Sequence, residues 1–523
     1  MSWTTLSAAL FDNPLIVHQR TSVIAGGRRL SFADLRRSAG AVAQTLRRGG
    51  IRRGDRVAVL LKNCPEFIEL FFGVTAAGAV VVPLNTRLHP KEHARLLQDC
   101  EPGLLVTSAS FVASVDEILA NVPSVARVVL LEPDSGPYAD YASWRGAGTG
   151  ETPESLPEPG DDAAILYTSG TTSSPKGVVL SHHNYVSDLE HVSAEIQPTL
   201  DSVNLQLSPM YHAAFVHTLV HLVRGASTVL NESFDVTATL EQIQSEAVTY
   251  FFAVPTMLYQ ILDHPRLREY DLRSLRLISY GAAAITGTRL REAIAAFGGD
   301  KLIHAYGLTE STSHSSVLHP AEHRTVPGSI GRGLHGVKLK VIRDDGSEAA
   351  AGEVGEIIVQ GDNVMKGYWR RPEESARTVV DGWLRTGDLG KPDQHGYVYV
   401  VDRKKDMVIS GGVNIYPRES EEVLAAHPSI AEVAVFGVPD PLWGESLVAA
   451  VVLRRGFSAT PESLLEFARG HLAGFKLPKD IRIVEALPKT ASGKVQKNEL
   501  RRNAAALGRD GGSRQFQEGA TSK

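Results

Sequence analysis

The feature that most constrains the fold is the alternation of buried-strand and amphipathic-helix patterns along the first third of the chain. A capping-box sequence at 31–34 (Ser-Phe-Ala-Asp) opens an amphipathic run that continues to Arg48. A buried strand is expected at 56–61, a helix at 65–77 and another strand at 79–84. This alternation predicts an α/β fold with a mainly parallel sheet.

The pattern changes after about Pro327. Two strands, at 337–342 and 354–360, flank an Asp-Asp-Gly turn at 344–346, which indicates a hairpin in a β-rich subdomain.

A second change follows Val401, where a compact α+β pattern begins. We expect helices at 417–426 and 461–472 and strands at 432–437 and 447–453. The predicted organisation is therefore a large N-terminal domain over 1–404, a small C-terminal domain over 405–506 and a disordered tail over 507–523.

Composition excludes several classes of protein. With 523 residues, 43% hydrophobic and 22% charged, the chain has ordinary globular usage and room for more than one domain. A net charge of −5 gives no overall basic field for nucleic acid. Two cysteines, Cys64 and Cys100, favour a reducing cytoplasm. The start lacks the pattern of a signal peptide, and no apolar run reaches the roughly 20 residues of a membrane span.

The strongest motif is the segment from Tyr167 to Gly177, which reads YTSGTTSSPKG and follows a short apolar run. Its hydroxyl and glycine residues supply N–H and O–H donors, and Lys176 adds a point charge, as binding of a polyphosphate requires. Pro175 excludes a Walker A loop. A solvated Ser/Thr-rich linker is the alternative, but the Pro-Lys-Gly ending and the preceding strand favour phosphate binding.

Four further segments accompany this loop: YGLTE at 306–310, TGDL at 386–389, DRKKD at 402–406 running into SGGVN at 410–414, and PKTASGK at 488–494. Each alone is a weak signal. Together, in this order and spacing, they closely resemble the adenylate-forming superfamily, which comprises acyl-CoA synthetases, nonribosomal adenylation domains and beetle luciferases. The resemblance extends from about Ser31 to Ala504.

The resemblance implies ATP and Mg²⁺ as cofactors and CoA as co-substrate. It assigns Glu310 to Mg²⁺ and the ATP or AMP contacts to Thr168, Ser169, Gly170, Thr171, Thr172, Lys176, Gly281, Ala282, Ala283, Tyr306, Thr309, Asp388 and Arg403. In this set the loop holds the terminal phosphates, Tyr306 stacks on adenine, Thr309 contacts the α-phosphate, and Asp388 binds the ribose with help from Arg403. Ser173 departs from the family pattern, which usually has glycine there.

The resemblance also makes Lys494 the catalytic lysine that bridges the substrate carboxylate and the α-phosphate. Lys405 falls at the hinge about which the small domain rotates, and Gly411 and Gly412 border the pantetheine tunnel after rotation. His212 matches a position near the substrate carboxylate. His217 and His221 have the spacing of a zinc pair, but Thr218 stands where a zincin needs glutamate, so we interpret them as packing or pocket-lining residues.

The implied function is an acid–CoA ligase. We further expect a cytoplasmic protein, with a homodimer as one option for its assembly. The acid pocket would be lined by His212, Ala213, Phe215, Tyr280, Ala282 and Ala305. None of the pocket segments supplies a charge to pair with a second ionic group on the substrate, which predicts an uncharged, bulky apolar monocarboxylic acid, whether aliphatic, alicyclic or aromatic. The alternatives are an adenylating enzyme that loads a carrier protein, one that stops at the adenylate, and a silent nucleotide-binding protein.

Overall fold

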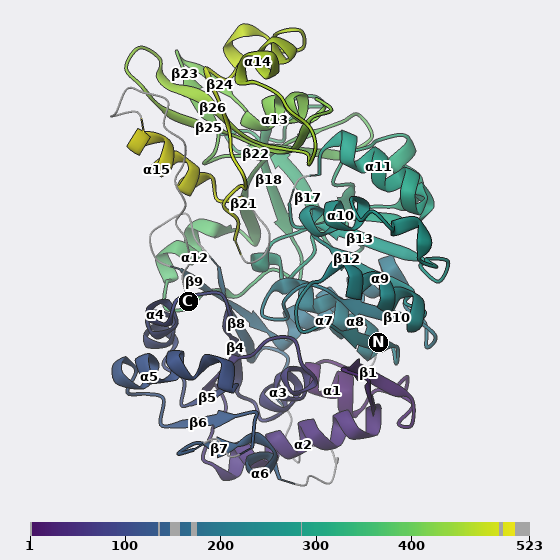
Figure 1. Ribbon diagram of the computed structural model, residues 1–523. Coiled ribbons are helices and arrows are strands. Elements are labelled where there is room, and N and C mark those ends of the chain that lie inside the picture. Colours follow the sequence, from purple (N-terminus) through teal and green to yellow (C-terminus); the bar gives the residue numbers. More distant parts are fainter. Residues whose placement is uncertain are drawn as a thin grey trace.

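The computed structural model describes residues 3–133, 136–146, 157–168, 175–283, 285–490 and 495–507. Residues 505–507 are described by their backbone alone. Within these residues the strands form four β-sheets with helices packed on them (Figure 1). Three sheets, A to C, are built from residues up to Arg403, and the fourth, sheet D, begins at Val408. In Figure 1 sheet D lies at the end of the molecule opposite the first helices.

Sheet A has nine strands in the order β16-β15-β14-β13-β12-β10-β11-β1-β2. Its interior pairs are parallel and its edge pairs antiparallel, so the expected mainly parallel sheet is confirmed. The strands are β16 (Arg332–Gly333), β15 (Ser316–Leu318), β14 (Leu302–Tyr306), β13 (Leu277–Gly281), β12 (Tyr250–Ala253), β10 (Val203–Gln206), β11 (Ser227–Leu230), β1 (Thr21–Ala25) and β2 (Arg28–Ser31).

Sheet B has eight strands in the order β19-β9-β8-β4-β3-β5-β6-β7. They are β19 (Gly367–Tyr368), β9 (Lys176–Ser181), β8 (Asp162–Thr168), β4 (Val80–Pro83), β3 (Arg56–Leu60), β5 (Leu104–Thr107), β6 (Arg127–Leu130) and β7 (Ala139–Asp140). The strands expected at 56–61 and 79–84 are thus β3 and β4. β8 and β9 pair antiparallel, so the phosphate-loop motif connects two adjacent strands.

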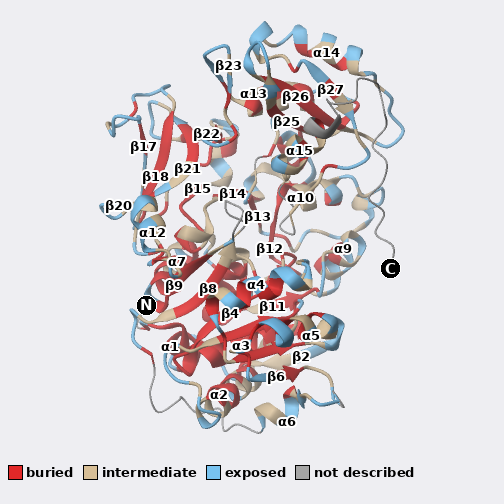
Figure 2. Ribbon diagram, turned by 90° about the vertical axis from the view of Figure 1, so that its left-hand side faces the viewer, coloured by how far each residue is buried: buried red, intermediate tan, exposed pale blue. Residues whose placement is uncertain are grey.

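Helices cover both sheets, and the predicted capping box is present. Ser31 Oγ accepts a hydrogen bond from Asp34 N at 3.1 Å, and Ser31 N donates to Asp34 Oδ2 at 3.0 Å, at the start of α2. The helices of this part are α1 (Leu6–Phe11), α2 (Phe32–Arg48), α3 (Pro65–Ala76), α4 (Pro90–Cys100), α5 (Val112–Asn121), α6 (Tyr141–Arg145), α7 (His182–Ile196), α8 (Val216–Val223), α9 (Val236–Ser245), α10 (Pro255–Leu262), α11 (Gly287–Phe297) and α12 (Pro372–Thr378). The largest core joins α1, α2, α3, α7 and α8 to sheet B (Figure 2).

Sheet C contains the predicted hairpin, β17 (Lys338–Ile342) and β18 (Gly355–Gln360), which pair antiparallel. Its other strands are β20 (Val379–Val380), β21 (Trp383–Pro392) and β22 (Val398–Arg403). The pairing of β21 with β22 places Asp388 opposite Arg403.

Sheet D and its helices form the α+β pattern expected after residue 401. The strands are β23 (Val408–Ser410), β24 (Val413–Ile415), β25 (Ile430–Asp440), β26 (Gly444–Leu453) and β27 (Asp480–Ile483), and the helices are α13 (Pro417–Ala425), α14 (Pro461–Arg469) and α15 (Lys497–Leu507). α14 is shorter than predicted because it stops at the C-cap Gly470. None of the helices in the described part of the chain has the length and apolar character that crossing a bilayer requires.

Candidate active site

The carboxyl edge of sheet A carries the segments expected to surround a nucleotide base. Gly281 ends β13 and lies opposite Ala305 on β14. A Cβ at Gly281 would lie 1.9 Å from the carbonyl oxygen of Ala305, so the close approach of the two strands requires glycine there. Ala282 follows with φ +63° and is exposed, a left-handed conformation that typically costs a non-glycine residue about 1–3 kcal/mol.

Tyr306, Asp388 and Arg403 are brought together although the sequence separates them widely. Tyr306 Oη donates a hydrogen bond to Asp388 Oδ2 at 2.8 Å, and Arg403 Nε lies 2.9 Å from Asp388 Oδ1. Asp388 is only 4% exposed, so its carboxylate is held in a fixed orientation. Burial, together with the charge of Asp388, raises the pKa of Tyr306, and the same carboxylate raises the pKa of Arg403.

Thr309 and Glu310 lie on a tight turn that follows β14. A Cβ at Gly307 would lie 1.9 Å from the carbonyl oxygen of Ser313, which shows how closely this turn folds back. Glu310 Oε1 accepts a hydrogen bond from Tyr368 Oη at 2.9 Å. Tyr368 was not among the sequence-predicted residues.

Lys176 begins β9 directly opposite Thr168, the last residue of β8. Its ammonium group forms an ion pair with Glu374 and lies 5.0 Å from the centre of the Tyr368 ring. Ser169, Gly170, Thr171, Thr172 and Ser173 lie outside the described residues. Glu374, like Tyr368, was missed by sequence reasoning. The GYWRRPEE run at 367–374 was the available signal, but nothing local connects it to Lys176.

The two aromatic rings expected to wall the acid pocket are packed against other side chains. Tyr280 is fully buried, stacks on His304 with ring centres 4.6 Å apart, and its hydroxyl lies 3.0 Å from His323 Nε2. Phe215 packs edge-on against Phe67 and Phe71 at 5.4 and 5.1 Å.

Phe215 and Tyr280 therefore belong to the cores of the large region. Sequence reasoning assigned them to the pocket by their position next to it, but that position does not fix which way a ring points. Ala305 is buried on β14, whereas Ala282 and Ala283 extend beyond β13, and Ala284 lies outside the described residues.

His212 precedes a short 3-10 turn, Ala213–Phe215, that leads into α8. Its ring packs against Tyr211 at 4.5 Å. His217 and His221 lie inside α8 as buried packing residues. His217 Nδ1 lies 2.6 Å from Tyr250 Oη, and His221 Nδ1 lies 2.7 Å from the carbonyl oxygen of His217. Burial lowers the pKa of both, that of His221 to about 4, so both rings are neutral near pH 7.

Three of the residues expected to act from the C-terminal region lie on exposed segments, namely Lys405, Gly411 and Gly412. Lys405 is exposed in the turn between β22 and β23. Gly411 and Gly412 form the turn between β23 and β24 with φ +57° and +80°. A Cβ at Gly411 would lie 2.7 Å from the Trp443 ring, whereas Gly412 faces open space. Lys494 lies outside the described residues, between Lys489 and Val495, which form an isolated β-bridge.

The residues present fit a nucleotide and a magnesium ion. With Oε1 bonded to Tyr368, Glu310 Oε2 accepts no hydrogen bond from any described residue. The described residues contain no cluster of three or more His, Cys, Asp or Glu that could hold a metal. One available carboxylate suits Mg²⁺, which keeps several waters and takes its remaining ligands from substrate phosphates.

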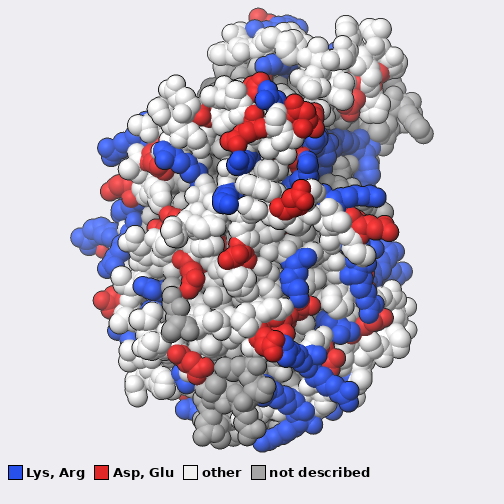
Figure 3. All heavy atoms as spheres, turned by 180° about the vertical axis from the view of Figure 1, so that it is seen from behind, with Lys and Arg blue, Asp and Glu red and all other residues white. Residues whose placement is uncertain are grey.

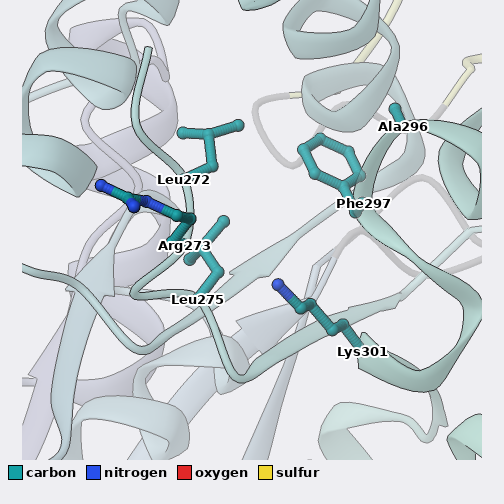
Figure 4. A pocket seen from close by; sticks show the side chains of 6 residues that line it. All are labelled: Leu272, Arg273, Leu275, Ala296, Phe297 and Lys301. Carbon is teal, nitrogen blue, oxygen red and sulfur yellow. The ribbon is translucent and has the colours of Figure 1, made fainter.

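A pocket of about 210 Å³ lies at the opposite edge of sheet A (Figure 4). It is lined by Leu272, Arg273, Leu275, Ala296, Phe297 and Lys301. These residues come from the segment before β13, the end of α11 and the residue before β14. The pocket is thus at the amino ends of the strands whose carboxyl ends carry Gly281 and Tyr306, and it is separate from the site.

On the face seen in Figure 3, basic side chains are interspersed with acidic ones.

Comparison with known proteins identifies the family of the chain. Residues 16–369 match the family described as AMP-binding enzyme, and residues 419–494 match the AMP-binding enzyme C-terminal domain. Feruloyl-CoA synthase of Amycolatopsis sp is 39% identical over 92% of this chain and 95% of its own length. Indoleacetate–CoA ligase of Aromatoleum aromaticum is 37% identical over 93% and 95%.

Among solved structures, ATP-bound MatB from Rhodopseudomonas palustris superposes with a TM-score of 0.89 at 35% identity, covering 96% of this chain and 99% of that one. The matches span nearly the whole chain in both sequence and structure. The chain therefore belongs to the AMP-binding enzymes, the adenylate-forming superfamily that its motifs resemble.

Proposed function

We propose that this enzyme is an ATP- and Mg²⁺-dependent acid–CoA ligase for an uncharged, apolar monocarboxylic acid. The acid carboxylate attacks the α-phosphate of ATP to give an acyl-AMP and pyrophosphate, and the CoA thiol then displaces AMP. The observation that carries the proposal is that Asp388 of sheet C and Lys176 of sheet B are both linked to the segment at the carboxyl end of β14. Asp388 is bonded to Tyr306, and Lys176 lies against Tyr368, whose hydroxyl is bonded to Glu310. Asp388, Glu310 and Lys176 supply a ribose acceptor, a metal ligand and a phosphate partner.

Each residue has a defined task in this proposal. Asp388, oriented by Tyr306 and Arg403, accepts hydrogen bonds from the ribose hydroxyls. Glu310 contributes an oxygen to Mg²⁺, and Thr309 contacts the α-phosphate. The motif from Thr168 to Lys176, with Ser169, Gly170, Thr171 and Thr172, surrounds the terminal phosphates.

The proposed organisation divides the work between two domains, 1–404 and 405–506, with 507–523 as a tail. Lys494 neutralises charge as the carboxylate approaches the α-phosphate. Rotation about Lys405 then removes Lys494 and brings Gly411 and Gly412 to the site for CoA entry. The end of β22 at Arg403 and the start of sheet D at Val408 support a boundary at this point.

The substrate class follows from the absence of a charged partner among the proposed pocket residues. Ala213, Ala282 and Ala305 are small, and none of the pocket residues carries a fixed charge to pair with a second carboxylate or an amine. An unpaired charge buried there would cost several kcal/mol. Relatives named for ferulate and indoleacetate support an acid that carries a ring.

The acceptor is proposed to be CoA, with transfer to a carrier protein as the alternative. The two cysteines, Cys64 and Cys100, are both free thiols in the structure, which supports the proposed cytoplasmic location. A homodimer is a further proposal, and light scattering at several concentrations tests it.

The decisive experiment is a mass-spectrometric screen of carboxylic acids with ATP, Mg²⁺ and CoA that detects acyl-AMP and acyl-CoA separately. We expect acyl-CoA from bulky apolar acids and acyl-AMP alone when CoA is omitted. Highest kcat/KM for acetate, malonate or an amino acid would contradict the substrate class. Adenylate without thioester in the presence of CoA would favour the carrier-protein alternative.

A further inference from the structure

Lys176 and Glu310 are connected through a residue that the proposed chemistry has not used. β19, which contains Tyr368, pairs antiparallel with β9, and Trp369 N donates to the carbonyl oxygen of Gly177 at 2.7 Å. This pairing holds Tyr368 beside Lys176. The tyrosine ring lies 5.0 Å from the lysine ammonium, and its hydroxyl donates to Glu310 Oε1 at 2.9 Å.

Glu374, on α12 just after this strand, forms an ion pair with the ammonium group of Lys176. Its hydrogen bond with Lys176 lowers the pKa of the Glu374 carboxyl, so this carboxyl is ionised at neutral pH. A triphosphate that reached Lys176 would meet this carboxylate at the same ammonium group. The carboxylate and the phosphates repel each other at this ammonium, so the ion pair with Glu374 weakens the contact that the phosphates can make with Lys176.

The two partners differ in freedom to move. The Lys176 side chain is 17% exposed and lies against the Tyr368 ring, whereas the Glu374 side chain is 36% exposed. Arg371 and Arg377 also lower the pKa of Glu374 through their charge, so cationic partners other than Lys176 are within electrostatic reach. The glutamate is therefore the partner that can leave.

We propose that Glu374 competes with the terminal phosphates of ATP for Lys176, and that Tyr368 keeps the lysine in place when Glu374 is displaced. This inference rests on the proposed function, in which Lys176 contacts those phosphates. Glu374 then sets how strongly the free enzyme discriminates ATP from AMP, because AMP lacks the phosphates that compete. It is a specificity-determining residue outside the set of nucleotide contacts.

The test is calorimetric titration of ATP and of AMP, with Mg²⁺ and without acid or CoA, into the full-length wild type and variants. Glu374→Gln should bind ATP about three- to tenfold more tightly and leave AMP binding within about twofold, because a partly buried ion pair is removed as a competitor. Glu374→Ala should do the same.

Glu373→Gln is the matched control. Glu373 is exposed and directly precedes Glu374, so the variant removes the same charge one residue away. It should change neither affinity. Unchanged or weaker ATP binding by both Glu374 variants, or equal tightening by Glu373→Gln, would overturn the proposal.

Lys176→Ala distinguishes failure of the proposed function from failure of the proposed competition by Glu374. If Lys176 contacts the terminal phosphates, Lys176→Ala weakens ATP more than AMP, and adding Glu374→Gln to Lys176→Ala has no further effect. If Lys176→Ala weakens both nucleotides equally, the assignment of Lys176 to the terminal phosphates fails. If it weakens ATP selectively and Glu374→Gln has no effect, the competition alone fails.

Discussion

The edge of sheet A and the hairpin end of sheet D present their proposed functional residues in opposite ways. Next to the carboxyl ends of the sheet A strands, Asp388 of sheet C is buried and held by both Tyr306 and Arg403, and Glu310 is held by Tyr368. At sheet D, Gly411 lies in an exposed turn against the Trp443 ring, and the neighbouring segments carry the exposed apolar side chains of Ile409, Val413 and Leu442. The first arrangement is preorganised for a small polar ligand, whereas the second presents an apolar surface.

Polar contacts join the two regions. Arg418 N donates to Asp402 Oδ2 at 3.0 Å, and Arg418 Nη1 donates to the carbonyl oxygen of Val400 at 2.7 Å. Arg454 on the sheet D side reaches Glu292 of α11 at 3.3 Å. Such a partly exposed ion pair contributes about 0–1 kcal/mol, which is small enough to be broken and remade in each cycle. The proposed rotation must break and remake contacts of this kind.

Acid should produce the largest difference in stability between the two regions. Burial lowers the pKa of His182, His221 and His304, all in the large region, to about 4 from an ordinary 6.5. Below pH 6.5 the unfolded chain binds protons at these histidines before the folded protein does. The free energy of unfolding therefore falls as the pH drops from 6.5 toward 4, by on the order of 2–3 kcal/mol for each histidine. The histidines of the described sheet D region, His427 and His471, are not buried.

Hydrogen exchange at pH 7.5 and pH 5, corrected for intrinsic rates, tests this difference. Peptides of sheet A should lose protection at pH 5 while those of sheet D keep it. Equal loss in both regions would contradict the assignment of acid sensitivity to the buried histidines.

Lys494→Ala should reduce acyl-AMP formation by about a hundred- to a thousandfold, because nothing else replaces its charge between two anions. CoA attack on a preformed adenylate should be spared. Pyrophosphate exchange and single-turnover thioester formation measure the two steps. Equal losses in both steps of a well-folded variant would be evidence against a lysine that acts in only one conformation.

Asp388→Ala should weaken ATP and AMP alike by about ten- to a hundredfold, since the ribose is common to both and Arg403 loses its buried partner. Calorimetric titration of both nucleotides measures it. Asp388→Asn is the control that keeps the shape and removes the charge. Selective loss of ATP binding would move Asp388 from the ribose to the phosphates.

Gly411→Ala should slow thioester formation by about tenfold and leave acyl-AMP formation unchanged. Gly411→Ala and Gly412→Ala share the strain of a positive φ, but only the first places a Cβ 2.7 Å from Trp443. Gly412→Ala should therefore have the smaller effect on thioester formation. Equal effects of the two variants would show that contact with Trp443 has no part in CoA delivery.

Local patterns in the sequence determined much of the fold and of the site's composition. The capping box at Ser31, the hairpin of β17 and β18 and the start of α13 at Pro417 depend on neighbouring residues, and each was predicted within a residue or a few. The same holds for the order of the motifs that identify the family. The capping box, the hairpin and the helix start depend on contacts between residues close in the chain, and a single sequence displays both these neighbours and the motif order directly.

Only the tertiary structure decided which residues meet. Tyr306 and Asp388 are 82 residues apart, Tyr368 and Glu310 are 58 apart, and their hydrogen bonds exist because separate sheets converge. Tyr280 and Phe215 turned into the cores because strands and helices buried on several sides give an aromatic ring more than one apolar direction to point. Glu374 reaches Lys176 for the same reason: β19 adds to the edge of sheet B, and no local pattern encodes that pairing.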